Sequence, residues 1–255
     1  MSALRNIKVL DLSRILAGPY STQILSDLGA EIWKVESPWG DDTRQWGPPF
    51  LNKESSYYLS ANRGKKSLII NLKSEKGQNI IKDLAKKADI LVENFKVGNL
   101  AKFGLDYKSL SEINPKLIYA SVTGFGQTGP RSSEPGYDAA LQGMTGIMSV
   151  TGEPDGRPTK VGVAWIDILT GLNATIGILG ALNERNTSGL GQHIDVSLFD
   201  VGIASMGYLA QNYLATGISA TRIGNAHPQV APYQDFEASN GNFIAAANND
   251  DQFQR

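Results

Sequence analysis

The 255-residue sequence has no cysteine and only two histidines, His193 and His227. Without cysteine the chain can form no disulfide bond, no thiolate nucleophile and no cysteine-ligated metal site. This absence agrees with a cytoplasmic protein, which is the location we expect. Two histidines give little basis for a histidine-rich metal site or for most histidine-based catalytic groups, so we expect no metal.

The sequence also lacks an excess of charge of either sign, with 24 basic and 25 acidic residues. A balanced chain gives no reason to expect a nucleic acid or an anionic membrane as partner. The N-terminus has no apolar core long enough for a signal peptide. The most apolar stretch, Ile166 to Leu182, is interrupted by four polar residues and is shorter than the roughly 20 residues of a membrane span. We therefore expect it to be a buried helix.

Strand-like and helix-like segments alternate along the first 125 residues and continue beyond them. The expected strands are residues 8–12, 31–36, 67–71, 89–93, 117–122, 193–196 and 242–247, and the expected helices are residues 20–28, 75–87, 168–182 and 200–214. This alternation predicts an α/β fold, with a Rossmann-like, mostly parallel sheet and helices on both of its faces. Ligands of such sheets bind beyond the carboxyl ends of the strands.

The composition of the chain changes after residue 123, where glycine-rich segments typical of loops begin. We expect a large domain over residues 1–200 that carries the ligand site, and a helical linker over residues 201–220. Residues 221–255 read as the beginning of a second, small α/β domain.

The glycine-rich nucleotide motifs are absent. The turn after the first strand, Ser13 to Pro19, has one glycine where the dinucleotide motif G-x-G-x-x-G needs three. The phosphate-binding motif G-x-x-x-x-G-K-[ST] does not occur either. The sequence therefore disfavours simple NAD or ATP binding at this turn.

Two other features could carry chemistry. Arg63, Lys65 and Lys66 gather three cations in five residues, which suits either a phosphate site or an ordinary solvated loop. Asp167 precedes an uncharged helical segment and suits either an N-cap or a nucleophile. A helix N-terminus favours the ionised carboxylate, and a carboxylate in a dry pocket can attack a thioester carbonyl. The residues alone leave both pairs of alternatives open.

Several segments together carry a family resemblance. In chain order they are VLDLSRILAGPYSTQILSDLGAEIWKVE, GDDTR, ANRGKKSLIINLK, VENF, GLDYKSLSEINPKLIYASVTGFGQTGP, GYD, and D-x-x-T-G with SGLGQHIDVSLFD. The chain resembles the family III CoA-transferases, or CaiB/BaiF family, over essentially its whole length. This family includes formyl-CoA transferase and carnitine CoA-transferase.

The resemblance implies a reaction and its participants. Asp167 matches the family's reactive carboxylate, which forms aspartyl anhydride and aspartyl-CoA thioester intermediates. Coenzyme A takes part as an acyl-CoA substrate together with a small carboxylic acid, and no cofactor is permanently bound. Full-length relatives are longer than 255 residues and form homodimers of two interlinked subunits.

The resemblance also assigns site residues. Ile15, Leu16 and Ala17 are expected to line the CoA pocket. Ser37 stands where a relative carries an arginine, so one contact with the nucleotide is either missing or supplied by the cluster at residues 63–66, which includes Arg63 and Lys65. Further expected contacts to the nucleotide or the pantetheine arm are Lys73, Asn94, Phe95 and Lys102. Tyr137 is expected beside the reactive carboxylate.

Other reactions remain as alternatives. The family's α-methylacyl-CoA racemases use a G-H-D motif, which here reads Gly136-Tyr137-Asp138. Tyrosine, with a pKa near 10, is a poor two-way proton relay at neutral pH, so transfer is favoured over racemisation. The loop from Gly224 to Gln229 lacks the family's glycine run and resembles the dicarboxylate-using branch, with His227 as a candidate contact for the acceptor acid. A non-catalytic acyl-CoA-binding chain is the third alternative.

Overall fold

The computed structural model describes residues 2–254, which divide into two compact units. The sheet unit consists of Met1–Leu141 and Ala164–Gly202, and the second unit of Gln142–Val163 and Ile203–Arg255. Residues 142–163 thus group with the later segment of the chain. The expected domain boundaries at residues 200 and 220 stay a prediction.

Six parallel strands form the sheet unit's core, in the order β5-β2-β1-β6-β7-β8. The strand order reverses between β1 and β6, and ligands of open α/β sheets bind at such a switch point. The predicted α/β fold with a mostly parallel sheet is confirmed. The strands are β1 Lys8–Asp11, β2 Glu31–Glu36, β5 Lys65–Ile69, β6 Ile90–Glu93, β7 Ile118–Thr123 and β8 His193–Ser197.

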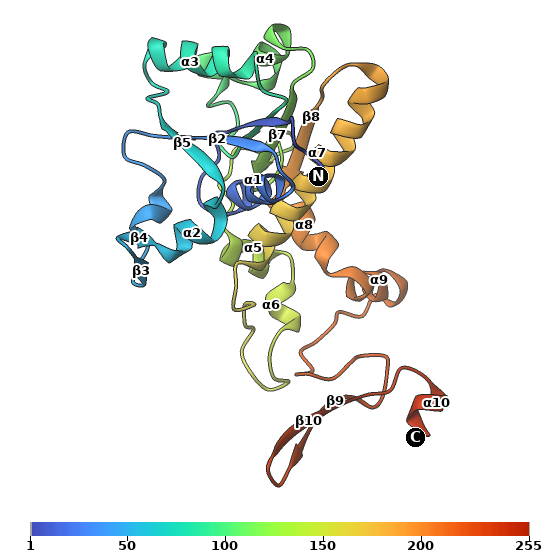
Figure 1. Ribbon diagram of the computed structural model, residues 1–255. Helices are drawn as coiled ribbons and strands as arrows, with labels where there is room; N and C mark the ends of the chain where they lie inside the picture. Colours follow the sequence, from blue (N-terminus) through green and yellow to red (C-terminus); the bar gives the residue numbers. More distant parts are fainter. Residues whose placement is uncertain (1, 255) are drawn as a thin grey trace. The chain divides into compact units, whose positions relative to one another are not determined.

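Helices cover both faces of this sheet (Figure 1). Helices α1 (Ala17–Asp27) and α7 (Trp165–Ser188) pack on one face, where Leu25 and Ile178 join a buried cluster with Val9. Helices α3 (Glu75–Ala85) and α4 (Tyr107–Ile113) cover the other face, in a cluster that includes Leu10. Successive residues of β1 thus feed opposite cores, because side chains alternate along a strand.

Short elements complete the sheet unit around these layers. They are η1 Asp42–Gln45, the small antiparallel pair β3 Phe50–Leu51 and β4 Glu54–Ser55, α2 Ser56–Asn62 and η2 Ala101–Phe103. Helix α3 begins where the Ser74 hydroxyl accepts a hydrogen bond from the N–H of Gly77 at 3.1 Å. Helix α7 ends at Gly189, whose φ of 74° allows the left-handed cap.

Helix α7 is apolar enough, over its 24 residues, to cross a membrane by length and composition alone. Such a test is also passed by core helices of soluble proteins. Helix α7 packs against α1, β7 and β8, and the predicted buried helix is found only in part, since Leu172 and Ile176 are 38% and 66% exposed.

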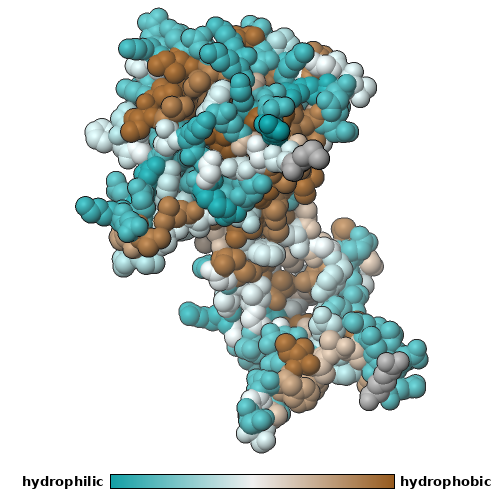
Figure 2. Space-filling model, in the orientation of Figure 1, coloured by the Kyte–Doolittle hydropathy of each residue, from teal (hydrophilic) through white to brown (hydrophobic). Residues whose placement is uncertain are grey.

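The second unit holds short helices and a hairpin. It contains α6 Ile147–Val150, α9 Gly207–Thr216, the antiparallel strands β9 Tyr233–Ala238 and β10 Gly241–Ala246, and α10 Asp250–Phe253; α5 Asp138–Met144 and α8 Leu198–Ser205 run across the unit boundaries. The single helix expected over residues 200–214 is wrong: α8 ends at Ser205 and α9 begins at Gly207, whose φ of 51° interrupts the helical backbone. Figure 2 shows apolar side chains on the surface of both units; on the hairpin they include Ile244, which is 77% exposed.

Candidate active site

A cavity of about 690 Å³ opens at the carboxyl ends of β1, β2, β5 and β6, where the strand order reverses. This volume falls within the range of about 300–1,000 Å³ that is usual for ligand sites. Its lining comes from the segments after these four strands, and includes Ser13, Arg14, Ser37, Trp39, Asp41, Asn71, Lys73, Phe95, Asn99, Lys102 and Phe103.

The cavity combines positive charge with aromatic surface. Lys73 and Lys102 both line it, and neither forms an ion pair with a carboxylate of residues 2–254. Phe95 and Phe103 supply apolar wall, and the indole of Trp39 is 88% exposed at the same cavity. The structure thus brings together three of the residues expected to contact a nucleotide, and adds Trp39, which the sequence analysis missed.

Arg63 and Lys65 do not line this cavity. The Arg63 guanidinium binds the carboxylate of Asp27, with Nε and Oδ1 3.0 Å apart. The Lys65 ammonium is buried and donates to Asp11 at 3.1 Å, to the carbonyl of Pro19 at 2.9 Å and to Asn62 at 2.9 Å. Burial lowers the pKa of Lys65 to about 8. Both cations thus have partners within the fold, and their expected phosphate role stays a prediction.

Asn94 acts on the main chain of the β1–α1 loop. Its side-chain oxygen accepts the N–H of Arg14 at 3.0 Å, and its amide nitrogen donates to the carbonyl of the same residue at 2.7 Å. Asn94 therefore holds the loop, and its neighbour Phe95, not Asn94 itself, lines the cavity.

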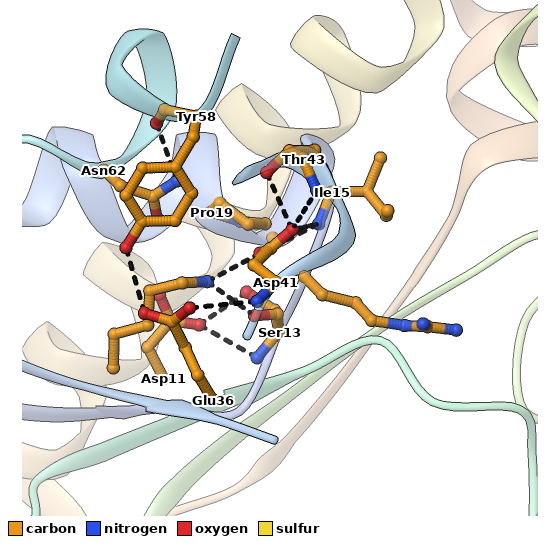
Figure 3. Close-up of polar contacts among 12 residues, drawn as sticks. Asp11, Ser13, Ile15, Pro19, Glu36, Asp41, Thr43, Tyr58 and Asn62 are labelled. Carbon is orange, nitrogen blue, oxygen red and sulfur yellow. Dashed lines mark hydrogen bonds and ion pairs between the residues drawn. The ribbon is translucent and has the colours of Figure 1, made fainter. Parts of the chain in front are cut away.

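The β1–α1 loop contains a strained residue. Ile15 has a φ of 72°, a left-handed conformation that β-branched side chains rarely adopt. Its N–H faces the carboxylate of Asp41, with N–O distances of 3.3 and 3.4 Å. Figure 3 shows the Ile15 side chain directed away from the polar group that holds its main chain.

Buried carboxylates and cations lie beneath this loop (Figure 3). Asp11 is fully buried, and burial opposes its ionisation, but Lys65 and Lys34 hold its pKa below the usual value. Burial likewise acts to raise the pKa of Glu36, while hydrogen bonds from Arg44 and Ser67 lower it to about 2. These acids are therefore ionised, partnered parts of the scaffold.

Asp167 lies in the first turn of α7, in a different electrostatic setting. The helix begins at Trp165 with Ala164 as N-cap, so of the two alternatives for Asp167 the N-cap is wrong. The cap is supplied from elsewhere: Oδ1 of Asp138 accepts the N–H of Ile166 at 2.8 Å and that of Asp167 at 3.3 Å. Burial, and then the charge of Asp138, raise the pKa of Asp167 to about 7.

The packing of α1 on α7 aligns Asp167 with the β1–α1 loop. Gly171, one turn after Asp167 on the same side of α7, touches α1 so closely that an added Cβ would lie 2.7 Å from the carbonyl of Ala17. One turn further, Thr175 and Ser21 hydroxyls are 3.0 Å apart. This face of α7 therefore runs along the start of α1, and Asp167 lies about one helical turn, roughly 5.4 Å along the axis, from the contact with Ala17.

Two tyrosines lie near this carboxylate in the chain or in space. Burial raises the pKa of Tyr57 to about 12, and the charges of Asp167, Asp138 and Asp41 add to this effect. Tyr57 therefore lies close enough to interact electrostatically with the start of α7 and with Asp41 below the β1–α1 loop. No sequence motif points to Tyr57. Tyr137 directly precedes the capping Asp138 and is 71% exposed.

A second cavity of about 340 Å³ is lined by Glu93, Ser121, Gln127, His193 and others. The Ser121 hydroxyl and Nε2 of His193 are 2.9 Å apart, and burial lowers the pKa of this histidine. Burial raises the pKa of Glu93 to about 7. Phe95 lines this cavity as well as the first, and its N–H donates to Glu93 at 2.8 Å.

His227 belongs to the second unit. Its ring lies between Tyr208 and Tyr233, with ring centroids 5.5 and 5.3 Å away, and its Nδ1 accepts the N–H of Gln229 at 3.1 Å. Its contact with an acceptor acid stays a prediction. Among residues 2–254, no group of three or more histidine, aspartate or glutamate side chains could hold a metal ion.

Comparison with known proteins shows the family of the chain. The family model of CoA-transferase family III matches residues 4–255. The chain belongs to CoA-transferase family III. It is 49% identical to a succinate–glutarate CoA-transferase of Agrobacterium fabrum, covering 99% of this chain and 65% of that protein. It is 47% identical to the human succinyl-CoA:glutarate CoA-transferase, covering 98% of this chain and 57% of that protein.

A solved structure of this family shows the same fold. The crystal structure of a CaiB/BaiF family protein from Brucella suis superposes with a TM-score of 0.92 at 52% sequence identity, over 99% of this chain and 68% of that one. The chain spans about 57–65% of the length of the curated family III relatives described above.

Proposed function

We propose that the protein transfers coenzyme A from an acyl-CoA to a carboxylic acid, with Asp167 as the covalent nucleophile. The observation that carries this proposal is the raised pKa of Asp167, which is about 7, in the first turn of α7 and next to the β1–α1 loop. A carboxylate poorly solvated by water is a competent nucleophile toward a thioester carbonyl.

The reaction proceeds by exchange at carbonyl carbons. An Oδ atom of ionised Asp167 attacks the donor thioester, the C–S bond breaks and CoA thiolate leaves, giving a mixed anhydride. The thiolate then attacks the aspartyl carbonyl and the donor acid departs, giving an aspartyl-CoA thioester. The acceptor carboxylate displaces the thiolate to form a second anhydride. Finally the thiolate attacks the acceptor's carbonyl, which releases the new acyl-CoA and frees Asp167.

The cavity at the strand ends supports binding of the CoA nucleotide. Lys73 and Lys102 are cations without a carboxylate partner among residues 2–254, and phosphate groups form charge-assisted hydrogen bonds with such side chains. The pantetheine arm would run from this cavity along the β1–α1 loop, past Ile15, Leu16 and Ala17, toward Asp167.

Dicarboxylic acids are the substrates we propose. The curated relatives named above act on succinate or succinyl-CoA and glutarate, at 47–49% identity. We propose succinyl-CoA as donor and a short dicarboxylate as acceptor. Homodimer assembly and a cytoplasmic location stay predictions.

The test is to trap the covalent intermediate. The protein is incubated with succinyl-CoA, digested and analysed by mass spectrometry, with Asp167→Asn as the matched control. We expect a hydroxylamine-sensitive adduct on the peptide that carries Asp167, and none in the variant. Folded protein that binds CoA without forming this adduct would instead be a non-catalytic acyl-CoA-binding protein.

Racemisation is disfavoured by the residues around Asp167. The position of the family's relay histidine is occupied by Tyr137, and His193 lines the second cavity beside Glu93. Wash-in of deuterium at the α-carbon of a 2-methylacyl-CoA would support racemisation, and we expect none.

Trp39 offers a specific prediction for the nucleotide end. Its main chain lies in a turn closed by a hydrogen bond from the N–H of Gly40 to the carbonyl of Ser37 at 2.9 Å, and its exposed indole lines the cavity. Stacking of a base on an aromatic ring contributes about 1–3 kcal/mol. We expect Trp39→Ala to weaken CoA binding about tenfold in calorimetry and to leave binding of 4′-phosphopantetheine, which lacks the base, within twofold. Equal losses for both ligands would exclude stacking.

A further inference from the structure

Side chains form hydrogen bonds with most of the main-chain N–H and carbonyl groups of residues 13–15 in the β1–α1 loop. The N–H of Ser13 donates to Asp11 at 2.9 Å, and its carbonyl accepts from the ammonium of Lys34 at 3.0 Å. Asn94 holds both main-chain groups of Arg14, and Asp41 accepts the N–H of Ile15. Loops usually satisfy their main-chain groups with water, so this pattern indicates a loop whose shape is imposed from outside.

Lys34 and Asp41 form the centre of this arrangement. Their side chains are 0% and 1% exposed, and Nζ lies 3.0 Å from Oδ2. Lys34 donates to the carbonyl of Ser13 and Asp41 accepts from the N–H of Ile15, so the ion pair contacts the loop on either side of residue 14. Both residues also line the large cavity.

The strain at Ile15 requires such support. A β-branched residue at a φ of 72° is unfavourable, and such conformations persist only where the surroundings over-determine them. The loop is also drawn tight at its far end, where Gly18 approaches Ser13 so closely that an added Cβ would lie 2.4 Å from the Ser13 Cβ. Strained backbone of this kind concentrates at ligand sites.

The loop lies between the cavity and the reactive carboxylate. Ser13 and Arg14 line the cavity, and Ala17 at the loop's end contacts α7 one turn from Asp167. A CoA thioester that reaches from one to the other must follow this loop. Displacement of the loop would therefore move the thioester carbonyl relative to Asp167, and errors of about 1 Å in such placement cost about 100-fold in rate.

We propose that the buried Lys34–Asp41 pair is a positioning device for the CoA thioester: it fixes the left-handed backbone of Ile15 and thereby the path of the substrate between the cavity and Asp167. This inference rests on the proposed CoA transfer. Neither Lys34 nor Asp41 takes part in bond making, so both are positioning residues.

The test separates positioning from stability by comparing Asp41→Asn with the double variant Lys34→Met/Asp41→Asn. The single variant leaves the Lys34 ammonium buried without an anionic partner, and we expect both stability and CoA affinity to fall. The double variant carries no buried unpaired charge, so urea unfolding should show most of the stability restored. Its asparagine keeps one acceptor oxygen where the carboxylate has two, and Thr43 already provides two donors to it. We therefore expect CoA affinity to stay about tenfold low and kcat/KM at least 30-fold low.

A matched control addresses the same carboxylate without touching the loop. Thr43→Val removes a hydroxyl that donates to Asp41 at 2.7 Å but leaves Ile15 and Lys34 in contact with it. We expect this variant to lose some stability and to bind CoA within twofold of the unaltered protein.

A second experiment relieves the strain directly. Glycine adopts positive φ without a steric penalty, so Ile15→Gly removes part of the need for support. We expect Asp41→Asn to weaken CoA binding about tenfold in the unaltered background and less than threefold in the Ile15→Gly background.

The outcomes are distinguishable. If the double variant binds CoA and turns over like the unaltered protein, or if the effects at residues 15 and 41 are additive, the pair is structural and the inference is overturned. If the unaltered protein itself neither binds nor transfers CoA, the proposed function fails instead.

Discussion

Carboxylates in two regions of the sheet unit have opposite electrostatic surroundings: those beneath the β1–α1 loop are buried, whereas Asp167 at the start of α7 is half-buried. Beneath the β1–α1 loop, Asp11 and Glu36 have lowered pKa values because lysine, arginine and hydroxyl groups surround them. At the start of α7, Asp167 faces the like charge of Asp138, forms no ion pair with a lysine or arginine of residues 2–254, and has a raised pKa.

This difference distinguishes carboxylates that stabilise the fold from a carboxylate that is available for reaction. A carboxylate whose lone pairs are occupied by cations is stable and unreactive, whereas one left without a cation keeps a lone pair for attack on a carbonyl. Raised pKa values of this kind concentrate at functional sites, although structural groups can show them too. Glu93, whose pKa is also raised to about 7, has its carboxylate bound to the N–H of Phe95.

The largest expected effect concerns the reactive side of this contrast. Asp167→Asn removes the proposed nucleophile while keeping the size of the side chain, so we expect kcat for CoA transfer to fall by at least about 1,000-fold. Discontinuous assays with succinyl-CoA and glutarate measure this loss. Calorimetry should show that the variant binds CoA with an affinity within threefold of that of the unaltered protein. A variant that keeps more than about one tenth of the activity would show that the two regions do not differ in this respect.

The next effect concerns the scaffold side. Lys65→Met leaves Asp11 buried without its nearest cation, and breaking one partner of a buried pair costs about 3–5 kcal/mol of unfolding free energy. Arg63→Met is the matched control, because the Arg63–Asp27 pair is exposed and such pairs contribute about 0–1 kcal/mol. Urea unfolding at pH 7 measures both changes. Equal small losses would mean that Lys65 is not part of the scaffold.

The smallest effect is a difference in pH dependence. Because the pKa values of Asp167 and Glu93 are raised in the folded protein, the folded state binds more protons than the unfolded chain between about pH 4.5 and 7. Their contribution to stability therefore falls as pH rises through this window. Glu36, with a pKa of about 2, acts in the opposite sense and loses its contribution as pH falls below about 4.5.

Variants isolate these contributions. Glu93→Gln should remove about 1–2 kcal/mol of the decline in unfolding free energy between pH 5 and 8, after allowance for solvent screening. Activity should respond in the other direction, because the proposed attack requires ionised Asp167: kcat/KM is expected to rise with pH through about 7. A flat profile between pH 6 and 8 would contradict the assigned pKa of Asp167.

Much of the fold could be predicted because the pattern of the chain is local. Apolar runs such as residues 8–12 and 31–36 reveal strands directly, and their alternation with helices implies parallel pairing. The break between α8 and α9 escaped prediction because it depends on the backbone angle of Gly207, which an apolar pattern does not encode. Strand β9 was missed because its alternation is weak.

The sequence names candidate site residues through the family resemblance, but it does not reveal roles that tertiary contacts decide. Lys65 looks like a solvated cation in the sequence, and only the approach of Asp11, 54 residues away, shows that it is buried. The cap of α7 likewise comes from Asp138, 28 and 29 residues before the N–H groups that it accepts. Such roles follow from distance in space, which spacing along the chain does not record.

The close approach of Gly124 and Gly136 has a mechanical consequence. An added Cβ on Gly124 would lie 2.6 Å from the Gly136 Cα, so the two backbones touch directly. Gly124 follows β7, and Asp138, which caps α7, lies two residues after Gly136. The sheet, this backbone contact, the cap and the first turn of α7 thus form a short rigid linkage. Thermal motion of Asp167 is therefore coupled to that of the sheet, and a side chain at either glycine would misalign the carboxylate without touching it.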